Sequence, residues 1–335
     1  MKTEIVVASA YDRHQRSLTA ATEKAAQLLR KGEIVALPTE TVYGLAADVL
    51  NPNAVAKIFE AKERPRFDPL IVHLPNRDWF DRVTQIRDED RKLIEKLADC
   101  FWPGPFTIVL PRKSIVPEIV TAGLDTVGVR ISAHPVFTQI IGAFGKPLAA
   151  PSANRFGCLS PTTAQHVLDE LDGRIPLLID AGQTSHGIES TIVVVHNGKI
   201  DILRRGPITA EQLSQFGKID IVSSAGKISA PGQLPVHYAP KTPLRLIEDA
   251  TSFSPPEKQR VGLLAWNPVR SEENFLAIRR LSEKQDFREA AANLFRCLRE
   301  LDELDLDLVV AERVPSQALG AAIMDRLERA ARKDD

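Results

Sequence analysis

One stretch of the chain has neither a helical nor a strand period, and it divides the sequence in two. Residues 223–243 (SSAGKISAPGQLPVHYAPKTP) are rich in serine, glycine and proline, a composition typical of a linker. On both sides of it, apolar runs of strand length alternate with amphipathic segments of helical length. Such alternation is typical of α/β domains. We therefore predict two α/β domains, residues 1–222 and 244–335, joined by a linker at 223–243.

Capping and turn residues locate individual elements of the first domain. Asn51-Pro52 is an N-cap followed by proline at the first helical position, which predicts a helix ending before Pro65. Asn197-Gly198 is typical of a type I′ turn and predicts a hairpin between STIVVV and KIDILR. The other expected elements include helices at 20–31, 88–101 and 135–145, strands at 69–74, 106–110 and 126–131, a strand at KPLAA and a short apolar run at 34–37.

The segment after the linker has its own alternating pattern. PLRLIE, RVGLLAW and LDLVVAE are expected to form strands, while REAAANLFRCLREL and QALGAAIMDRLERAAR are expected to form helices. Strands that alternate with helices predict a small parallel-sheet domain.

The bulk composition argues against several classes of protein. The 335 residues carry a formal net charge of −1, so strong nucleic-acid binding through net charge alone is not expected. The three cysteines are widely spaced and form no CxxC pair, which argues against a disulfide framework or a cysteine-rich zinc site. The N-terminus does not have the features of a signal peptide, and the apolar runs are only strand-sized. We expect a cytoplasmic protein with no membrane partner.

The common glycine-rich nucleotide motifs are absent. The sequence contains no GxGxxG and no GxxxxGK[ST], so phosphates would have to be held in another way. Lys62 and Arg64, in AKERP at a predicted helix end, are candidates because two cations beside a chain reversal can converge on a polyphosphate. The structural alternative is that cations at a helix C-terminus simply favour the macrodipole.

Two short polar segments follow apolar strands. Ser152 and Asn154 come after KPLAAP, and Thr41 lies in the PTET segment after a short apolar run. Ligands of open α/β sheets bind at the carboxyl ends of strands, where hydroxyls and amides can meet a phosphate or a carboxylate. The alternative is that each segment is a turn or a cap.

Polar residues also occur inside or beside apolar strands. His73 in PLIVHL is either a core histidine or a ligand contact, and Arg130 in TVGVRIS needs an anionic partner, from the protein or from a substrate. Ser190 in GIEST and the pair Arg204-Arg205 in ILRRGP add hydroxyls and cations at strand ends.

The order of these segments along the chain is more specific than any one of them. The run from KGEIVALPTETVYGL to DPLIVHL resembles the YrdC-type threonylcarbamoyl-adenylate synthase family, as do WPGPFT, VGVR, PSAN, SPTTA, GIESTIV and LRRG in that order. The family's KxR…SxN signature appears as Lys62, Arg64, Ser152 and Asn154. The resemblance covers about residues 15–206. The segment APGQLPVHYAPKTP resembles the PGxxxxHYAP linker of longer members, which add a C-terminal Rossmann-like domain that fits residues 244–335.

The resemblance implies both a fold and a reaction. The fold is a twisted, open mixed sheet with a large concave, electropositive cavity. In the reaction, L-threonine, bicarbonate and ATP with Mg²⁺ yield threonylcarbamoyl-adenylate, pyrophosphate and water. A separate tRNA threonylcarbamoyl transferase complex then modifies adenosine 37 of tRNA. No protein cluster of metal ligands is expected, since positioning and charge stabilisation suffice for this chemistry.

The resemblance also assigns roles to residues. Lys62 and Arg64 would be catalytic. The predicted nucleotide contacts are Lys62, Arg64, Thr126, Asn154, Ser160 and Arg204, with Tyr238 and His237 supplied by the linker as a lid. The predicted threonine contacts are Thr41, His73, Arg130, Ser152 and Ser190.

This chain departs from the family pattern in two places. Long members often have SPGMKYKHYAP in the linker, whereas this chain has Ala230, Gln233, Pro235 and Val236 there, so a cation before His237 is missing. Most relatives have LRPG where this chain has LRRG, which leaves Arg205 as an alternative to Arg204.

Two other functions stay open from the sequence. One is an RNA-binding module in tRNA or ribosome metabolism, with weak RNA binding through a local basic patch. The other is an accessory domain of the hydrogenase-maturation type, although the acylphosphatase and zinc-finger segments that accompany that role are missing.

Overall fold

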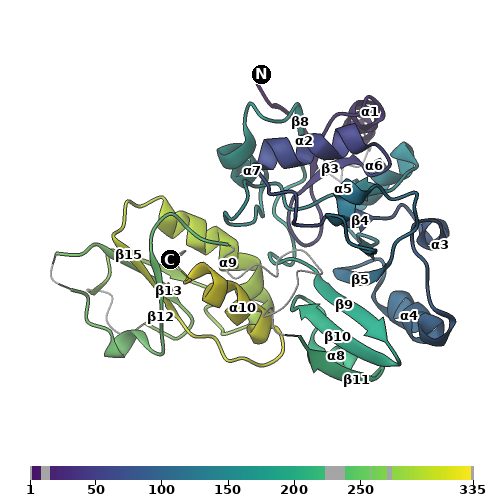
Figure 1. Ribbon diagram of the computed structural model, residues 1–335. Coiled ribbons are helices and arrows are strands. Elements are labelled where there is room, and N and C mark those ends of the chain that lie inside the picture. Colours follow the sequence, from purple (N-terminus) through teal and green to yellow (C-terminus); the bar gives the residue numbers. More distant parts are fainter. Residues whose placement is uncertain (1, 9–15, 223–237, 257, 270–273, 333–335) are drawn as a thin grey trace. The chain divides into compact units, whose positions relative to one another are not determined.

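The structure is a computed structural model that describes residues 2–8, 16–222, 238–256, 258–269 and 274–332 (Figure 1). The described residues cluster into two units. The first holds those within Met1–Phe156, Pro161–Ser185 and Glu189–Leu234, and the second holds those within Gly157–Ser160, His186–Ile188 and Pro235–Asp335. Residues 223–237 of the predicted linker lie outside the description, so the boundaries at 222 and 243 remain predictions.

The first unit is a mixed α/β structure. Among its described residues, the helices are α1 (Arg16–Arg30), α2 (Pro52–Lys62), α3 (Phe80–Val83), α4 (Asp88–Phe101), α5 (Glu118–Thr121), α6 (Pro135–Phe144), α7 (Ala164–Leu171) and α8 (Ala210–Leu213). The strands are β1 (Glu4–Val7), β2 (Val35–Leu37), β3 (Gly44–Asp48), β4 (Ile71–His73), β5 (Phe106–Pro111), β6 (Thr126–Arg130), β7 (Leu148–Ala149), β8 (Leu177–Asp180), β9 (Thr191–His196), β10 (Lys199–Arg204) and β11 (Lys218–Ile221).

The strands of this unit form one mixed sheet in the order β1-β8-β2-β3-β7-β4-β6-β5-β9-β10-β11. Parallel pairs such as β4 with β6 and β5 with β9 alternate with antiparallel pairs such as β5 with β6 and β9 with β10. The chain crosses between distant strands, so segments far apart in sequence become neighbours in the sheet. The predicted mixed sheet is confirmed.

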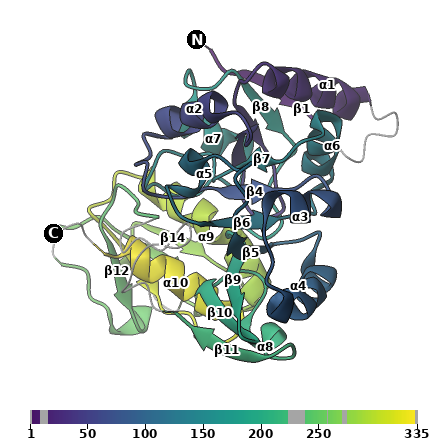
Figure 2. The same ribbon diagram turned by 45° about the vertical axis from the view of Figure 1, so that its right-hand side comes forward.

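The sheet buries both faces, because successive side chains of a strand point to opposite sides. In β2, Val35 and Leu37 pack in a cluster with α1 and α6, while Ala36 packs in a larger cluster with α2, α4 and α7. Helices α1 and α6 lie side by side in both views, and so do α2 and α7 (Figures 1 and 2). The core therefore has two layers, one on each face of the sheet.

Local signals located several elements correctly. The Asn51 side chain accepts hydrogen bonds from the backbone N–H groups of Asn53 and Ala54, as an N-cap does, and α2 ends at Lys62, before Pro65. Asn197 and Gly198 both have positive φ angles, 51° and 72°, so the β9–β10 turn has the type I′ character expected. The helix predicted at 88–101 matches α4, whereas the helix predicted at 20–31 begins earlier, at Arg16.

The second unit contains a small parallel sheet, as predicted. Its described strands are β12 (Leu244–Ile247), β13 (Val261–Ala265), β14 (Ala277–Arg280) and β15 (Leu308–Glu312), and its helices are α9 (Phe287–Asp302) and α10 (Gly320–Ala330). The strand order is β12-β15-β13-β14, and each neighbouring pair is parallel. Strand β14 was not predicted from the sequence.

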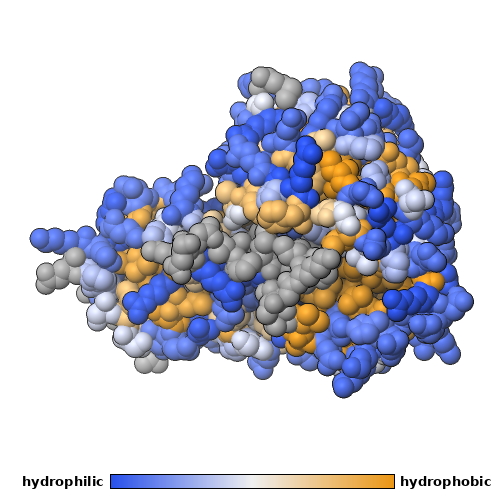
Figure 3. All heavy atoms as spheres, viewed as in Figure 1, coloured by the Kyte–Doolittle hydropathy of each residue, from blue (hydrophilic) through white to orange (hydrophobic). Residues whose placement is uncertain are grey.

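Hydrophilic side chains cover most of the surface in the view of Figure 3, with apolar patches between them. The large exposed apolar side chains of the described residues are Ile5, Val7, Phe67, Ile115, Ile221, Val222, Leu276 and Leu304. Most of them are scattered along the chain, as is normal for folded domains. None of the helices in the described part of the chain combines the length and the apolar character needed to cross a membrane.

Candidate active site

One face of the sheet, here called the site face, carries several of the polar residues singled out above, among them His73, Arg130 and Arg204. It carries a small apolar cluster of Ile71, Val109, Ile192 and Leu203, from β4, β5, β9 and β10. His73 is two residues after Ile71, so the pleat directs both side chains to the same face. The predicted residues of β4 and of the strands beside it can therefore be located relative to this cluster.

His73 and Arg130 lie side by side on the site face. They are in-register partners at the ends of the parallel strands β4 and β6. The imidazole is only 2% exposed, and its centroid lies 4.7 Å from that of the Phe137 ring. Burial, together with the positive charge of Arg130, holds the pKa of His73 well below its ordinary value. Its Nδ1 has no hydrogen-bond partner among the described residues.

The Arg130 guanidinium is buried and has a protein anion beside it. Its Nη2 donates to the Glu40 carboxylate, and its Nη1 lies 3.2 Å from the Thr41 hydroxyl oxygen. Burial by itself would raise the pKa of Glu40, but Arg130 and a 2.5 Å hydrogen bond from the Ser132 hydroxyl outweigh it and lower that pKa. The Nε of Arg130 has no partner in the described part of the chain. The anionic partner that the sequence required is thus an internal glutamate, with one N–H left over.

The PTET segment holds Thr41 against Arg130 through a local network. The Thr39 hydroxyl lies 2.7 Å from the Thr41 hydroxyl, donates to the carbonyl oxygen of Val42 at 2.6 Å and accepts from the backbone N–H of Thr41. Ser185 donates to the carbonyl oxygen of Glu40. The turn is therefore an ordered, buried structure, and its Thr41 hydroxyl faces the guanidinium.

A β-bulge brings Arg204 to the site face. Ile202 pairs with Val193, but the next pair is Arg204 with Ile192, so Leu203 is the extra residue. Without this extra residue, Arg204 would lie on the same face of the sheet as Ile202, which packs in the large core cluster opposite the site face. The bulge instead aligns Arg204 with Ile192 of the site face.

Arg204 and Ser190 form a bonded group at the start of β9. The Arg204 Nε and Nη2 donate to the Ser190 carbonyl and hydroxyl oxygens, each at 3.0 Å, and the Ser190 hydroxyl lies 2.9 Å from that of Thr107. Gly206 presses on the same segment, because a Cβ built there would lie 2.4 Å from the backbone nitrogen of Thr191. The end of the GIEST segment, at Ser190 and Thr191, therefore packs directly against the LRRG segment.

Lys62 lies at the end of α2 and is only 1% exposed. Its Nζ donates to the carbonyl oxygens of Ser152 at 2.6 Å and Asn154 at 2.5 Å, and its own carbonyl oxygen accepts from the backbone N–H of Phe156. The lysine therefore bonds to the SAN segment, about ninety residues later in the chain. A purely dipolar role at its own helix end does not account for these contacts.

Arg64 lies beyond the left-handed C-cap residue Glu63, which turns the chain back. Its guanidinium is buried and donates to the carbonyl oxygens of Asp68 at 3.2 Å and Pro69 at 2.8 Å. It also makes a 2.8 Å ion pair with the Asp68 carboxylate. Arg64 therefore organises the turn that leads into β4.

Asp68 is a buried carboxylate on which several of the predicted cations act electrostatically. Burial raises the pKa of its carboxyl, while Arg64, Lys62 and Arg204 act on it in the opposite direction. Three cations from α2, the following turn and β10 thus lie within electrostatic reach of one carboxylate. Together, Lys62, Arg64, Arg204 and Asp68 are here called the cation cluster. The sequence indicated its cations but missed Asp68.

Not every predicted contact joins these groups. Thr126 begins β6 while Arg130 ends it, so the two are separated by about 13 Å at roughly 3.3 Å per residue. Ser160 and Tyr238 are buried and belong to the second unit. His237 lies outside the described residues. Glu40 and Ser132 were missed, although Glu40 lies within the PTET segment itself.

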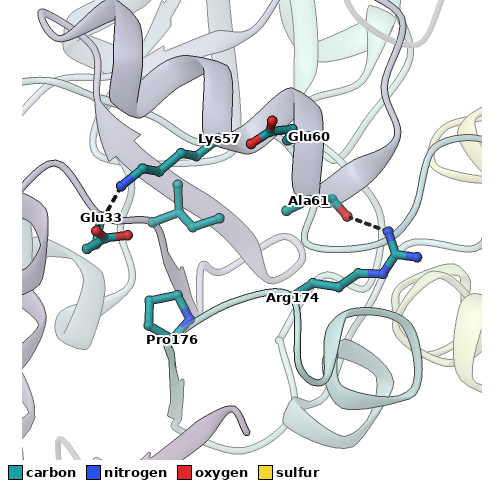
Figure 4. A pocket seen from close by; sticks show the side chains of 7 residues that line it. Glu33, Lys57, Glu60, Ala61, Arg174 and Pro176 are labelled. Carbon is teal, nitrogen blue, oxygen red and sulfur yellow. Dashed lines mark hydrogen bonds and ion pairs between the residues drawn. The ribbon is translucent and has the colours of Figure 1, made fainter. Parts of the chain in front are cut away.

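A pocket of about 360 Å³ lies elsewhere, beside α2 and the segment that leads into β8 (Figure 4). Its lining residues are Glu33, Ile34, Lys57, Glu60, Ala61, Arg174 and Pro176. Figure 4 shows Lys57 paired with Glu33 at 2.8 Å and Arg174 reaching the carbonyl oxygen of Ala61. None of the predicted site residues lines it. Its cations are partly exposed and already paired, Lys57 with Glu33 and Arg174 with Glu63, so we do not place a substrate there.

Two family models match the chain. The model described as "Telomere recombination", for the Sua5, YciO and YrdC proteins, matches residues 27–206. The model described as "Threonylcarbamoyl-AMP synthase, C-terminal domain" matches residues 208–332. The fold is thus that of the Sua5, YciO and YrdC class of α/β proteins. The solved structure of E. coli YciO shares the fold at a TM-score of 0.51 and 17% identity, over 61% of this chain and 96% of that one.

Curated relatives narrow the class. The chain is 38% identical over 323 residues to the threonylcarbamoyl-AMP synthase of Pyrococcus abyssi, covering 91% of this chain and 92% of the relative. It is 39% identical over 327 residues to that of Bacillus subtilis, covering 92% of both. The structure of P. abyssi Sua5 complexed with L-threonine matches at a TM-score of 0.87 and 35% identity over 98% of both chains. The chain belongs to the threonylcarbamoyl-AMP synthase family.

Proposed function

We propose that this chain joins L-threonine, bicarbonate and ATP into threonylcarbamoyl-AMP and releases pyrophosphate and water. The family membership supports the enzyme class, a transferase that forms an adenylate. Three buried cations support the nucleotide side of the reaction: Arg64, which pairs with the buried Asp68 carboxylate at 2.8 Å, and Lys62 and Arg204, whose charges also act on that carboxylate. Dispersed buried cations suit a polyphosphate because each contributes charge at a different oxygen.

Threonine would bind at the ends of β4 and β6. Two neighbouring buried groups there, the Arg130 Nε and the His73 Nδ1, have no partner among the described residues. Unpaired buried polar atoms are costly, and a ligand that satisfies them gains that free energy. We propose that Arg130 receives the threonine carboxylate, while Thr41 and the hydroxyl of Ser190 complete the polar surround. Ser152 would contribute beside Lys62.

The chemistry has two bond-forming steps. The nitrogen of the threonine amine forms a bond to the carbon of bicarbonate, and water is lost, which gives a carbamate. A carbamate oxygen then attacks the α-phosphorus of ATP. The bond between this phosphorus and the oxygen that bridges it to the β-phosphorus breaks, and pyrophosphate leaves. Lys62 and Arg64 would stabilise the negative charge that builds up on the leaving group. Burial would protect the carbamate from water.

Mg²⁺ would enter with ATP, held mainly by phosphate oxygens and water as is usual for this ion. Within the described residues there is no group of three or more histidine, cysteine, aspartate or glutamate side chains that could hold a metal. Asp68 is the carboxylate of the cation cluster, so its donor chemistry fits a supporting contact. The ion would supply further neutralisation of phosphate charge. Asn154, Ser160, Thr126, Tyr238 and His237 stay predicted nucleotide contacts, and the concave electropositive cavity stays a prediction.

Several wider features also stay proposals. We propose that a separate transferase complex carries the product to adenosine 37 of tRNA, that the enzyme acts in the cytoplasm, and that any RNA binding is weak. We propose the domain limits 1–222 and 244–335, with 223–243 as linker. Limited proteolysis that cleaves within 223–243 and leaves both flanking parts intact would support these limits.

The reaction can be tested directly. The protein is incubated with ATP, Mg²⁺, bicarbonate and labelled threonine, and both adenylate and pyrophosphate are measured. We expect pyrophosphate release that depends on threonine and bicarbonate together and that stops when Mg²⁺ is chelated. ATP hydrolysis without any threonine dependence would reject the proposed function. An RNA-binding module would instead show salt-dependent RNA affinity that survives loss of Lys62 and Arg64.

A further inference from the structure

One side of α9 carries three residues at helical spacing, Ala292, Phe295 and Arg299. At about 1.5 Å per residue, this row is about 10 Å long. Within the second unit, each position on it contacts a different segment from elsewhere in the chain. We call this row the α9 anchor.

The first contact is a backbone approach at Gly187. A Cβ built on Gly187 would lie 2.5 Å from both the carbonyl oxygen of Ala291 and the Cα of Ala292. Gly187 also has a φ of +70°, in the left-handed region that favours glycine. Only a residue without a side chain fits here, so segment 186–188 rests directly on the helix backbone. Ser190 follows two residues later.

The other two contacts lie further along the helix. The Tyr238 ring centroid is 5.4 Å from that of Phe295. The Arg299 side chain, in a residue only 8% exposed, donates from Nη2 to the carbonyl oxygen of Leu159. The backbone N–H of Ala239 donates to the carbonyl oxygen of Gly157 at 3.0 Å, so segment 157–160 is held at two points.

All three anchored segments adjoin predicted nucleotide or threonine contacts. Segment 157–160 ends in Ser160 and follows Asn154 by three residues. Segment 186–188 leads into Ser190, which bonds to Arg204. Tyr238 is itself a predicted nucleotide contact. A single helix face thus contacts three irregular segments that contain or adjoin predicted nucleotide or threonine contacts.

We propose that the α9 anchor positions these segments for ATP, with Arg299 as its positioning residue. The inference rests on the proposed function. Irregular segments cost conformational entropy to order when a ligand binds, and anchoring them beforehand removes part of that cost. Arg299 suits the role because its planar guanidinium is pre-organised and remains charged. The helix therefore serves nucleotide affinity without touching the reacting atoms.

The test measures Kd for ATP with Mg²⁺ and Kd for L-threonine by calorimetry, and steady-state KM and kcat, in the full-length protein. Loss of a hydrogen bond to a charged group corresponds to about tenfold or more in affinity. We expect Arg299→Ala to raise the ATP Kd and KM by about that factor and to leave the threonine Kd within about twofold of wild type. Arg299→Lys should recover part of the loss. Gly187→Ala should also raise the ATP Kd, because it disturbs the anchor at a different contact. Its threonine Kd can rise as well, because segment 186–188 leads into Ser190, so the selectivity is judged on Arg299→Ala alone.

Arg296→Ala is the matched control. Arg296 is on the same helix, but it is about a third exposed and pairs with Glu300, so its removal should leave the ATP Kd unchanged. Wild-type ATP affinity in both Arg299→Ala and Gly187→Ala, or an equal loss of threonine affinity in Arg299→Ala, would overturn the inference. Failure of the wild type to release threonine-dependent pyrophosphate would instead overturn the proposed function, since ATP affinity is measured separately.

Discussion

His73 and Arg130 are in-register neighbours on β4 and β6, and each has one buried nitrogen without a partner among the described residues. One basic group is kept neutral by burial, while the other is paired with Glu40. A small zwitterion with a carboxylate and a hydroxyl fits such a pair, because it can supply both a charge and hydrogen bonds.

The first prediction concerns Arg130. Arg130→Lys keeps the charge but removes the planar fork that serves Glu40, Thr41 and a carboxylate together. We expect KM for L-threonine to rise about tenfold to a hundredfold, as for loss of a charge-assisted hydrogen bond, with KM for ATP nearly unchanged. Steady-state kinetics measure both values. Arg91→Lys, at an exposed ion pair on α4, is the control. Equal effects on both substrates would argue against a threonine-specific role.

The second prediction concerns stability against pH. His73 has a lowered pKa in the folded protein, whereas in the unfolded chain its pKa has the ordinary value of about 6.5. Below about pH 6.5 the unfolded chain therefore binds more protons than the folded protein does. The stabilising contribution is complete above that pH and is lost as the pH falls through it, by up to about 1.4 kcal/mol per pH unit. We expect His73→Gln to have a smaller loss of unfolding free energy between pH 7.5 and 5.5 in urea titrations. His134, whose pKa burial also lowers, would account for the remaining slope. Parallel pH profiles for wild type and His73→Gln would contradict this.

The third prediction separates the fold from the function of Arg64. Arg64→Ala leaves the buried Asp68 carboxylate without its ion-pair partner, which costs about 3–5 kcal/mol. Adding Asp68→Asn removes the uncompensated charge, so the double variant should regain much of the unfolding free energy. We expect it to remain orders of magnitude less active, because the cation proposed to bind the phosphates is still missing. Recovery of both stability and ATP turnover would show that Arg64 acts only in the fold.

The fourth prediction concerns Gly206. A Cβ there would lie 2.4 Å from the backbone nitrogen of Thr191 and 2.6 Å from the carbonyl oxygen of Glu189. Gly206→Ala must therefore displace the segment that carries Ser190. We expect the free energy of unfolding to fall by about 1–3 kcal/mol, as for overpacking, and KM for L-threonine to rise. Gly142→Ala, on α6 with nothing within 4 Å of the added carbon, should be neutral or stabilising. Comparable thermal denaturation of the two variants would refute the packing argument.

How far the sequence predicted the site differs from residue to residue. Lys62 and Arg64 were found because two cations beside a chain reversal can converge on a polyphosphate, and Arg130 and Arg204 because a cation inside or at the end of an apolar strand is unusual. Asp68, Glu40 and Ser132 were not found, because common polar residues in loops have no local signal of burial. Their role appears only in the folded chain, where Arg64 bonds to Asp68 in the turn that follows it and Arg130 bonds to Glu40, ninety positions earlier.

The sequence by itself determined the elements with local causes and the family to which the chain belongs. Asn51 caps α2 and Asn197-Gly198 turns the β9–β10 hairpin, because each of these features depends on neighbouring residues alone. The order of the motifs along the chain identifies the class. The tertiary structure decided which residues meet. The extra residue Leu203 turns Arg204 to the site face, and Lys62 bonds to the carbonyls of a segment far along the chain. Strand order and register depend on contacts between distant segments, and a one-residue shift moves a side chain to the opposite face of the sheet.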